Sequence, residues 1–240
     1  MKLVEKNENK IVFTEELNES LANAIRKYIG QIPILAVDEV EISKNGSPLY
    51  DETIAHRIGL LVLKTNKPVN EKTNILLKLD SKKEGMIYSE ELKGGAKVVY
   101  DKVPITSLKK GQELILNARA KMGRGIKHSK FSPGLMFYRN IINIKVDKNC
   151  PKEVIDGCPQ KVLEAKDGKV IVKDILKCDM CESCTDLCKK QGKDTIKLIP
   201  TKDLVITIES FGQISVQDIL KKSAEILKKD LAEVAKKAGK

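Results

Sequence analysis

The sequence lacks tryptophan, and aromatic residues make up only 4% of its 240 residues. Platforms for base stacking are therefore scarce. Only five of the 44 basic residues are arginine, the side chain best suited to forked contacts with phosphates and guanine edges. We therefore expect the formal charge of +11 to reflect mainly a solvated lysine surface. A weak, salt-sensitive attraction to nucleic acid is the alternative.

Other absences narrow the class of protein further. No run approaches 18 apolar residues, and the first residues, Met1–Asn7, do not form the apolar core of a signal peptide. We expect a globular, cytoplasmic protein with no membrane partner. The chain also has no Asp-x-Asp pair of the kind that could hold the Mg²⁺ ions of nucleotidyl transfer. No catalytic residue is assigned.

Two short helices with apolar faces are predicted within residues 17–64. In the first, apolar residues recur at helical spacing, at Leu17, Leu21, Ala24, Ile25 and Tyr28. Thr14 is the expected N-cap, and Gly30 and Pro33 end the helix. A strand over 34–42 and a turn at Asn45-Gly46 follow. The second helix begins near Asp51 and repeats the apolar stripe, at Ile54, Ile58, Leu61 and Val62, which Leu60 and Leu63 widen. This surplus of apolar surface indicates a docking element.

Strands dominate most of the remaining chain. An opening strand pair is expected over 3–13, a linker at Asn66–Asn70, and further strands over 74–79, 96–100, 113–120, 137–146 and 203–209. The segment 121–134 fails the G-x-G-x-x-G pattern, because His128 occupies the place of the third glycine. It is a loop whose Arg124, Lys127, His128, Lys130 and Phe131 could touch nucleic acid or a protein.

A long C-terminal helix is predicted to begin after Ser215, where Ser215 and Asp218 resemble a capping box. Its apolar residues follow a heptad, which favours a surface that faces a partner helix. The alternative is packing on the first two helices of the same chain. The heptad positions are Leu220, Ala224, Leu227, Leu231, Val234 and Ala238.

The helical region carries a family resemblance. SLANAIRKYIGQIPILAVDEVEI followed by SPLYDETIAHRIGLLVLK resembles the dimerisation region of the α-type subunits of cellular RNA polymerases, above all the archaeal D subunits. The resemblance implies an α+β fold with a discontinuous dimerisation domain (1–65 and 201–240), a β-rich domain that contacts the large subunits (66–146) and an insert (147–200). It also implies that the 121–134 loop contacts the second-largest subunit.

The insert contains all six cysteines, arranged as Cys178-x2-Cys181-x2-Cys184-x3-Cys188, with Cys150 and Cys158 upstream. Three thiolates at two-residue gaps can hold three corners of an iron–sulfur cube, and a fourth ligand comes from elsewhere. Structural zinc sites usually take two separate knuckles, which fits less well. We therefore expect an iron–sulfur site, with a zinc site as the first alternative and no bound metal as the second. Without an export signal, a disulfide framework is disfavoured.

The insert is also similar to two-cluster bacterial ferredoxins. That resemblance assigns Cys158, followed by proline, as the fourth ligand of one [4Fe–4S] cluster held with Cys178, Cys181 and Cys184. A [3Fe–4S] form is the alternative. The second cluster site lacks its cysteines, so Cys150 and Cys188 are left as a disulfide pair, part of a second metal site or free thiols.

These observations favour a non-catalytic assembly subunit of a DNA-directed RNA polymerase. By the family resemblance it would pair with the small α-like subunit L, contact subunits N, P and B, and meet DNA only through the assembled enzyme. The expected partner interface consists of Leu21, Ile25, Tyr28, Ile54, Ile58, Leu61, Leu220, Leu227, Leu231 and Val234. A ferredoxin-like electron-transfer or redox protein and a zinc-dependent nucleic-acid-binding protein are the competing hypotheses. If the cluster has no electron partner, its role is to keep the small insert folded.

Overall fold

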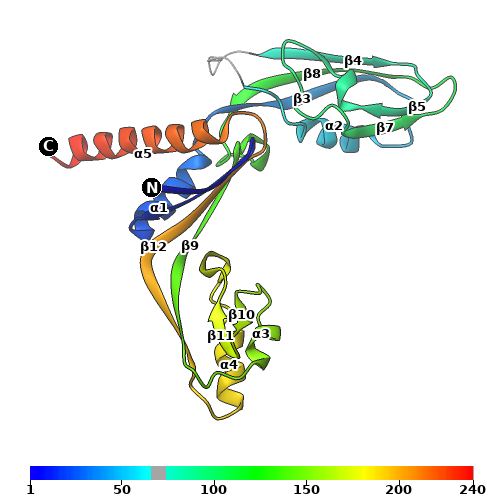
Figure 1. Ribbon diagram of the computed structural model, residues 1–240. Helices are drawn as coiled ribbons and strands as arrows, with labels where there is room; N and C mark the ends of the chain where they lie inside the picture. The colour runs from blue at the N-terminus through cyan, green and yellow to red at the C-terminus, as the bar shows by residue number, and fades with distance from the viewer. Residues whose placement is uncertain (66–73, 240) are drawn as a thin grey trace. The chain divides into compact units, whose positions relative to one another are not determined.

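The computed structural model describes residues 1–65 and 74–239 and divides into two compact units (Figure 1). Unit 1 comprises Met1–Lys6, Val12–Ala22 and Phe137–Thr207, and unit 2 comprises Asn7–Ile11, Asn23–Met136 and Ile208–Lys240. Unit 2 thus contains the C-terminal helix together with residues 23–136, and the expected division into three domains stays a prediction. The expected linker at Asn66–Asn70 lies outside the described residues.

Most of a four-stranded sheet lies in unit 1. Its strands pair in the order β1 (Lys2–Lys6), β2 (Lys10–Glu16), β12 (Ile196–Ser210) and β9 (Gly134–Val146). The predicted opening strand pair is confirmed, with a polar turn in which Asn7 N–H donates to the Lys10 carbonyl at 2.8 Å.

The expected N-cap at Thr14 is wrong, because β2 continues through this residue to Glu16. Asn18 takes the capping place instead. Its Oδ1 accepts the N–H of Ser20 at 2.8 Å, so helix α1 (Glu19–Ile29) begins two residues later than Leu17. At its other end, as predicted, α1 stops before Gly30.

The insert connects β9 to β12 and forms a small layer of its own. A hairpin turns at Asp167 and Gly168, whose φ angles of 51° and 74° are those a tight two-residue turn requires. The insert core combines apolar residues of β9 with residues of the insert itself: Ile142, Ile144, Val154, Val162, Leu163, Val170, Cys188 and Ile196. Its elements are α3 (Glu153–Asp156), β10 (Leu163–Lys166), β11 (Lys169–Val172), the 3₁₀ turn η3 (Ile175–Lys177) and α4 (Ser183–Lys190).

Unit 2 is built on a second four-stranded sheet. Its strands pair in the order β3 (Ile34–Asn45), β8 (Leu114–Gly123), β4 (Ile75–Ser81) and β6 (Lys93–Gly94). Helix α2 (Asp51–Gly59) packs on β3, and a separate pair, β5 (Gly85–Tyr88) with β7 (Pro104–Leu108), completes the layer. Two 3₁₀ turns lie between strands, η1 (Ser89–Glu91) and η2 (Ser129–Phe131).

The predicted strand over 96–100 is wrong. This segment contributes only one isolated bridge, between Val98 and Leu63. The chain instead pairs with β4 through Lys93 and Gly94. Gly94 lies so close to β4 that a Cβ there would stand 2.3 Å from the Leu76 carbonyl oxygen, which requires glycine. Strands β5 and β7 were not predicted.

Helix α5 (Val216–Ala238) closes the described chain. The predicted cap is confirmed, because Ser215 Oγ accepts the Asp218 N–H at 3.1 Å. The buried side of α5 belongs to its first half and consists of Val216, Ile219, Ser223 and Leu227. None of the helices in the described residues is long and apolar enough to cross a membrane.

Candidate functional site

Four of the six cysteines line one cavity in unit 1. Cys158 follows α3, Cys178 follows η3, Cys181 lies in the loop after it, and Cys184 is in the first turn of α4. The remaining wall is largely apolar and includes Ile144, Val162, Leu163 and Leu198. The structure thus brings together the four cysteines that the sequence and the ferredoxin resemblance name as ligands, across a separation of 20 residues between Cys158 and Cys178.

The backbone around Cys181 adopts an unusual conformation. Met180 and Glu182, on either side of it, have φ angles of 59° and 62°. Non-glycine residues adopt this left-handed region at an energetic cost and cluster at functional sites. The Cys181 N–H donates to Asp179 Oδ1 at 3.2 Å. Two left-handed residues in three turn the chain sharply, so that cysteines at two-residue gaps can line one cavity.

Burial controls the protonation of two of these thiols. It raises the pKa of Cys178 and raises that of Cys184 to about 11. Repulsion from Cys158 raises both values further, which reflects how close these sulfur atoms lie. At neutral pH both groups therefore carry their protons. A metal-bound thiolate has lost its proton, so binding of a metal by these cysteines would release protons.

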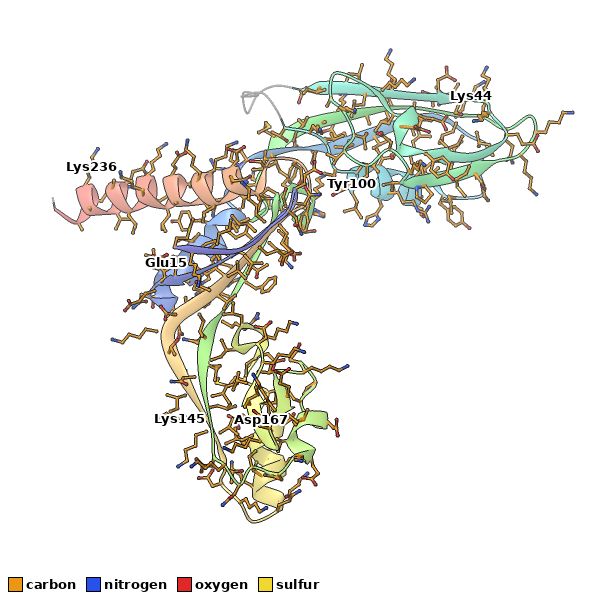
Figure 2. All side chains as sticks on the ribbon, viewed as in Figure 1. Glu15, Lys44, Tyr100, Lys145, Asp167 and Lys236 are labelled. Atoms are coloured by element: carbon orange, nitrogen blue, oxygen red, sulfur yellow. The ribbon has the colours of Figure 1, made fainter. Side chains whose placement is uncertain are left out.

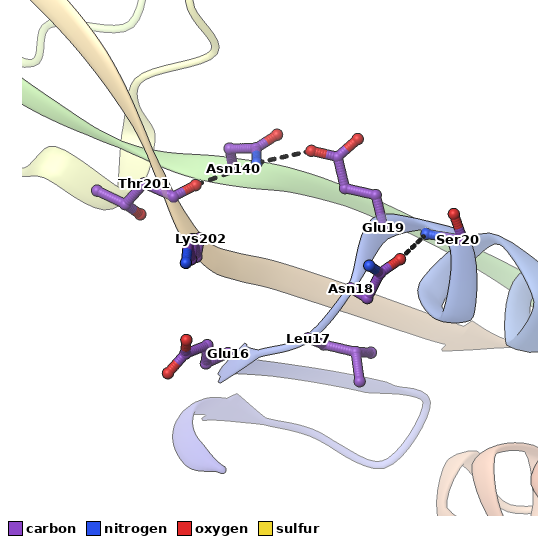
Figure 3. A pocket seen from close by; sticks show the side chains of 8 residues that line it. All are labelled: Glu16, Leu17, Asn18, Glu19, Ser20, Asn140, Thr201 and Lys202. Atoms are coloured by element: carbon purple, nitrogen blue, oxygen red, sulfur yellow. Dashed lines mark hydrogen bonds between the residues drawn. The ribbon is translucent and has the colours of Figure 1, made fainter.

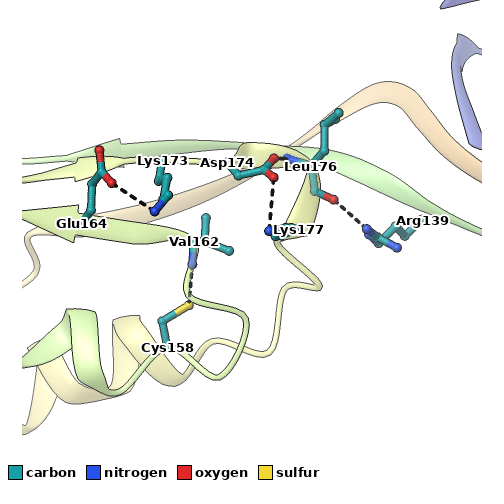
Figure 4. Close-up of polar contacts among 8 residues, drawn as sticks. All are labelled: Arg139, Cys158, Val162, Glu164, Lys173, Asp174, Leu176 and Lys177. Carbon is teal, nitrogen blue, oxygen red and sulfur yellow. Dashed lines mark hydrogen bonds and ion pairs between the residues drawn. The ribbon is translucent and has the colours of Figure 1, made fainter. Parts of the chain in front are cut away.

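The turn that leads into Cys178 is held by polar contacts, shown in Figure 4. Asp174 Oδ1 accepts the Leu176 N–H at 3.1 Å and so caps η3. The Leu176 carbonyl in turn accepts a hydrogen bond from Arg139 Nη2 of β9 at 2.6 Å. At the opposite wall, the Val162 N–H donates to Cys158 Sγ at 3.4 Å. Backbone donors of this kind tune iron–sulfur centres.

The donor set fits an iron–sulfur cluster, because sulfur ligands from four positions face an apolar space. The cavity itself measures about 20 Å³, close to the room that one water molecule needs. A cluster would require the cavity to widen, and Cys181 is the exposed member of the four cysteines. Among the described residues, no three His, Cys, Asp or Glu side chains are placed to hold one metal ion. The metal assignment stays a prediction.

Cys150 and Cys188 lie apart from the cavity lining and next to each other. Burial and, to a lesser degree, the neighbouring Cys188 thiol raise the pKa of Cys150, and the Thr195 hydroxyl donates to Cys188 Sγ at 3.3 Å. Cys188 is buried and Cys150 is half-buried. The sequence left these two as a possible pair, but it gave no indication that Thr195 joins them.

Part of the expected partner interface is wrong, because the chain covers it with its own residues. Ile54 and Ile58 are fully buried, and Leu61 is 5% exposed. All three belong to the unit 2 core, with β3, β4 and β8. Leu227 is also buried, on α5. The helical spacing of these residues identified a buried face correctly, but the face is buried by a sheet of the same chain.

Other residues of the expected interface remain accessible. On α5, Leu231 is 58% and Val234 62% exposed. We call these two residues the α5 patch. Figure 2 shows this end of α5, near the labelled Lys236, with its side chains directed into open space. Leu21 is exposed, and Ile25, Tyr28 and Leu220 are half-buried. A hydrogen bond to Asp230 raises the pKa of Tyr28, so α1 and α5 contact each other in unit 2.

Ion pairs hold the 121–134 loop against β3. Asp38 on β3 pairs with Lys130 at 2.9 Å and with Lys121. Lys130 Nζ also lies 5.1 Å from the centre of the Phe131 ring. Phe131 is buried, so it cannot stack on bases, whereas Ile126 at the tip is 71% exposed. The exposed apolar tip favours a protein contact over nucleic acid. Asp38 was missed by the sequence analysis, since it lies more than 80 residues from the loop.

A polar cavity of about 690 Å³ lies in unit 1 where α1 begins (Figure 3). Asn140 of β9 donates to Glu19 Oε1 at 3.0 Å and to the Thr201 carbonyl of β12 at 3.2 Å. These bonds fix the first turn of α1 on the sheet. No local pattern predicts this contact, because it joins three segments that are far apart in the sequence.

Comparison with known proteins relates the chain to transcription enzymes. Residues 23–137 match the family described as the RNA polymerase Rpb3/RpoA insert domain. The chain is 32% identical to DNA-directed RNA polymerase subunit Rpo3 of Pyrococcus furiosus, over 95% of this chain and 92% of that protein. It is also 32% identical to subunit Rpo3 of Archaeoglobus fulgidus, over 98% and 96% of the two chains. Its identity to DNA-directed RNA polymerase II subunit rpb3 of Dictyostelium discoideum is 27%, over 95% and 91%.

Proposed function

This chain belongs to the Rpo3/Rpb3 family of DNA-directed RNA polymerase subunits, and on that premise we propose that it is a non-catalytic platform for assembly of the enzyme. The resemblance to archaeal D subunits is thereby confirmed at the level of the family. The observation that carries the proposal is the α5 patch. A helix that leaves Leu231 and Val234 more than half exposed presents apolar surface that water solvates poorly.

We assign the small α-like subunit L as the partner that covers the α5 patch. The assignment rests on the family resemblance and on the heptad spacing of Leu227, Leu231 and Val234, which suits helix-to-helix packing. The exposed Ile126 at the tip of the 121–134 loop supports a second contact, with the second-largest subunit, B. Contacts with subunits N and P rest on the resemblance alone.

Co-expression with subunit L tests the main contact. Val234→Glu and Leu231→Glu each place a charge in the patch, and recovery of the heterodimer should fall at least about tenfold, as expected when a charge is buried without a partner. Ala232→Glu introduces the same side chain on the opposite face of α5 and should leave recovery unchanged. If the patch variants bind as wild type does, or the control variant loses binding equally, the α5 patch is not the interface.

We further propose that Cys158, Cys178, Cys181 and Cys184 hold one iron–sulfur cluster that keeps the insert folded. When bound, such a group supplies four covalent links across a small domain with little core of its own. The support is the convergence of four thiols on one apolar cavity from segments before and after the β10/β11 hairpin. The left-handed residues beside Cys181 support the same role.

Anaerobic expression with iron and sulfide analysis tests the cluster. Wild type should contain close to one cluster per chain and show a broad visible absorption, and Cys184→Ser should lose both. Cys188→Ser, a buried cysteine outside the cavity, serves as the control and should keep them. Stoichiometric zinc in place of iron, or iron retained by Cys184→Ser, would contradict the assignment.

A further inference from the structure

The 3₁₀ turn η3, which leads into Cys178, ends at a carbonyl that a distant side chain occupies. Within the turn, the Ile175 carbonyl accepts the Cys178 N–H at 3.2 Å. The next carbonyl is that of Leu176, and it would accept the Asp179 N–H if the turn continued. Arg139 takes this place, because its Nη2 donates to the Leu176 carbonyl at 2.6 Å (Figure 4). The contact thus lies where η3 ends.

The end of η3 decides where the Cys178 side chain lies. Cys178 itself is extended, with φ −66° and ψ 123°, and it lines the cavity. Another turn of 3₁₀ helix would require ψ near −25° at this residue. Because the side chain and the following backbone rotate with this angle, Cys178 reaches the cavity wall only if η3 stops here.

Arg139 makes this contact from the main sheet of unit 1 rather than from the insert. It is half-buried on β9, which pairs with β12. Its neighbour Asn140 donates to Glu19 Oε1 and to the Thr201 carbonyl, so β9 is held on both sides at this point. A guanidinium is a charged donor of fixed planar geometry, which makes its hydrogen bond to a carbonyl short and directional.

We propose that Arg139 is a positioning residue for the cysteine cavity: by ending η3, it holds Cys178 in the cavity wall before a metal is bound. This inference rests on the proposed metal site. Ligands that are already in place lose less conformational entropy when they bind. Arg139, which lies outside the cavity lining, therefore raises the affinity of the four cysteines for a metal.

Hydrogen exchange of the metal-free full chain, followed by mass spectrometry, tests the positioning itself. Arg139→Met keeps a long side chain and removes the donor, so amides of residues 175–178 should exchange at least about tenfold faster than in wild type. Strands β10 and β11 should exchange at the wild-type rate. Arg119→Met, which changes an exposed arginine of unit 2, is the matched control and should change neither. Unchanged exchange at 175–178, or equally faster exchange throughout the insert, would overturn the proposal.

Titration of the reduced, metal-free full chain with Co²⁺ tests the consequence, because cobalt–thiolate bonds absorb visible and near-ultraviolet light. The signal should be absent in Cys184→Ser. Affinity should fall about 10–100-fold in Arg139→Met, and Arg139→Lys, which keeps a charged donor, should recover most of it. Equal affinity of Arg139→Met and wild type, or a wild type that binds no Co²⁺, would overturn the inference. A wild type that binds Co²⁺ through these cysteines but carries no iron after anaerobic expression would refute the cluster and leave the role of Arg139 intact.

Discussion

The assignment of α2 to the core of unit 2 leads to a quantitative prediction for Ile58→Ala. Ile58 is fully buried and contacts the sheet through α2. The substitution removes three carbon atoms, worth about 0.8 kcal/mol each in lost burial, and leaves a cavity that the sheet cannot close. We expect the free energy of unfolding of the isolated chain to fall by about 3 kcal/mol. The thermal midpoint should fall by about 6–12 °C for a chain of this size.

Leu60→Ala is the matched control for this prediction. Leu60 directly follows the same helix but is 49% exposed, so its truncation should change stability by less than about 0.5 kcal/mol. Urea denaturation followed by circular dichroism gives both values, and co-purification with subunit L gives the binding. An Ile58→Ala chain as stable as wild type, but unable to bind subunit L, would refute the reasoning and return α2 to the partner interface.

Three further predictions follow from polar contacts and from the cavity. Ser215→Ala removes the side-chain acceptor of the Asp218 N–H and should lower stability by about 1 kcal/mol in urea denaturation, whereas Ser215→Asp should keep it. The Lys121 and Lys130 ammonium groups hold the pKa of Asp38 below its ordinary value, chiefly through the hydrogen bond from Lys121. The stability that Asp38 contributes is therefore present above the unfolded-state pKa near 4 and is lost as the pH falls through the lower folded-state pKa. The free energy of unfolding of wild type should exceed that of Asp38→Asn at pH 7, and the difference should shrink as the pH falls below about 4. Cys181→Ser should unfold the insert, measured as protease sensitivity of residues 151–187 in the metal-loaded chain, while recovery of the heterodimer with subunit L stays unchanged. If the variant loses the folded insert and the heterodimer to the same degree, the insert and the partner interface are not independent.

The sequence predicted correctly the elements that depend on residues close together in the chain. The helix cap at Ser215 and the strand pair around Asn7 depend on turn and capping chemistry within a few residues. The wrong predictions concern residues whose secondary structure depends on contacts with strands far away in the sequence. Thr14 is a good N-cap by itself, but pairing with β12 extends β2 past it. Residues 96–100 are apolar enough for a strand, yet the chain pairs with β4 earlier, at Lys93 and Gly94, where a side chain in place of Gly94 would meet the β4 backbone.

The cysteine cavity shows the same division between local and distant information. The spacing of Cys178, Cys181 and Cys184 specifies a compact loop by itself, because two-residue gaps leave little freedom. Cys158 joins them through the β10/β11 hairpin and the packing of α3 against α4, which no spacing rule contains. Its place therefore had to come from a resemblance. Thr195 beside Cys188 had no signal of either kind.

The heptad of α5 is the pattern whose meaning the structure changes most. Apolar periodicity states only that a face is buried, and it does not state by what. On α2 the sheet of the same chain buries that face. On α5 the spacing continues without a break from Leu227 to Leu231 and Val234, yet exposure rises from 8% to 58% and 62%. Nothing in the composition of the helix changes at that point, since exposed lysines flank both halves. We infer that the second half of α5 carries a buried-face pattern because another polymerase subunit completes its burial.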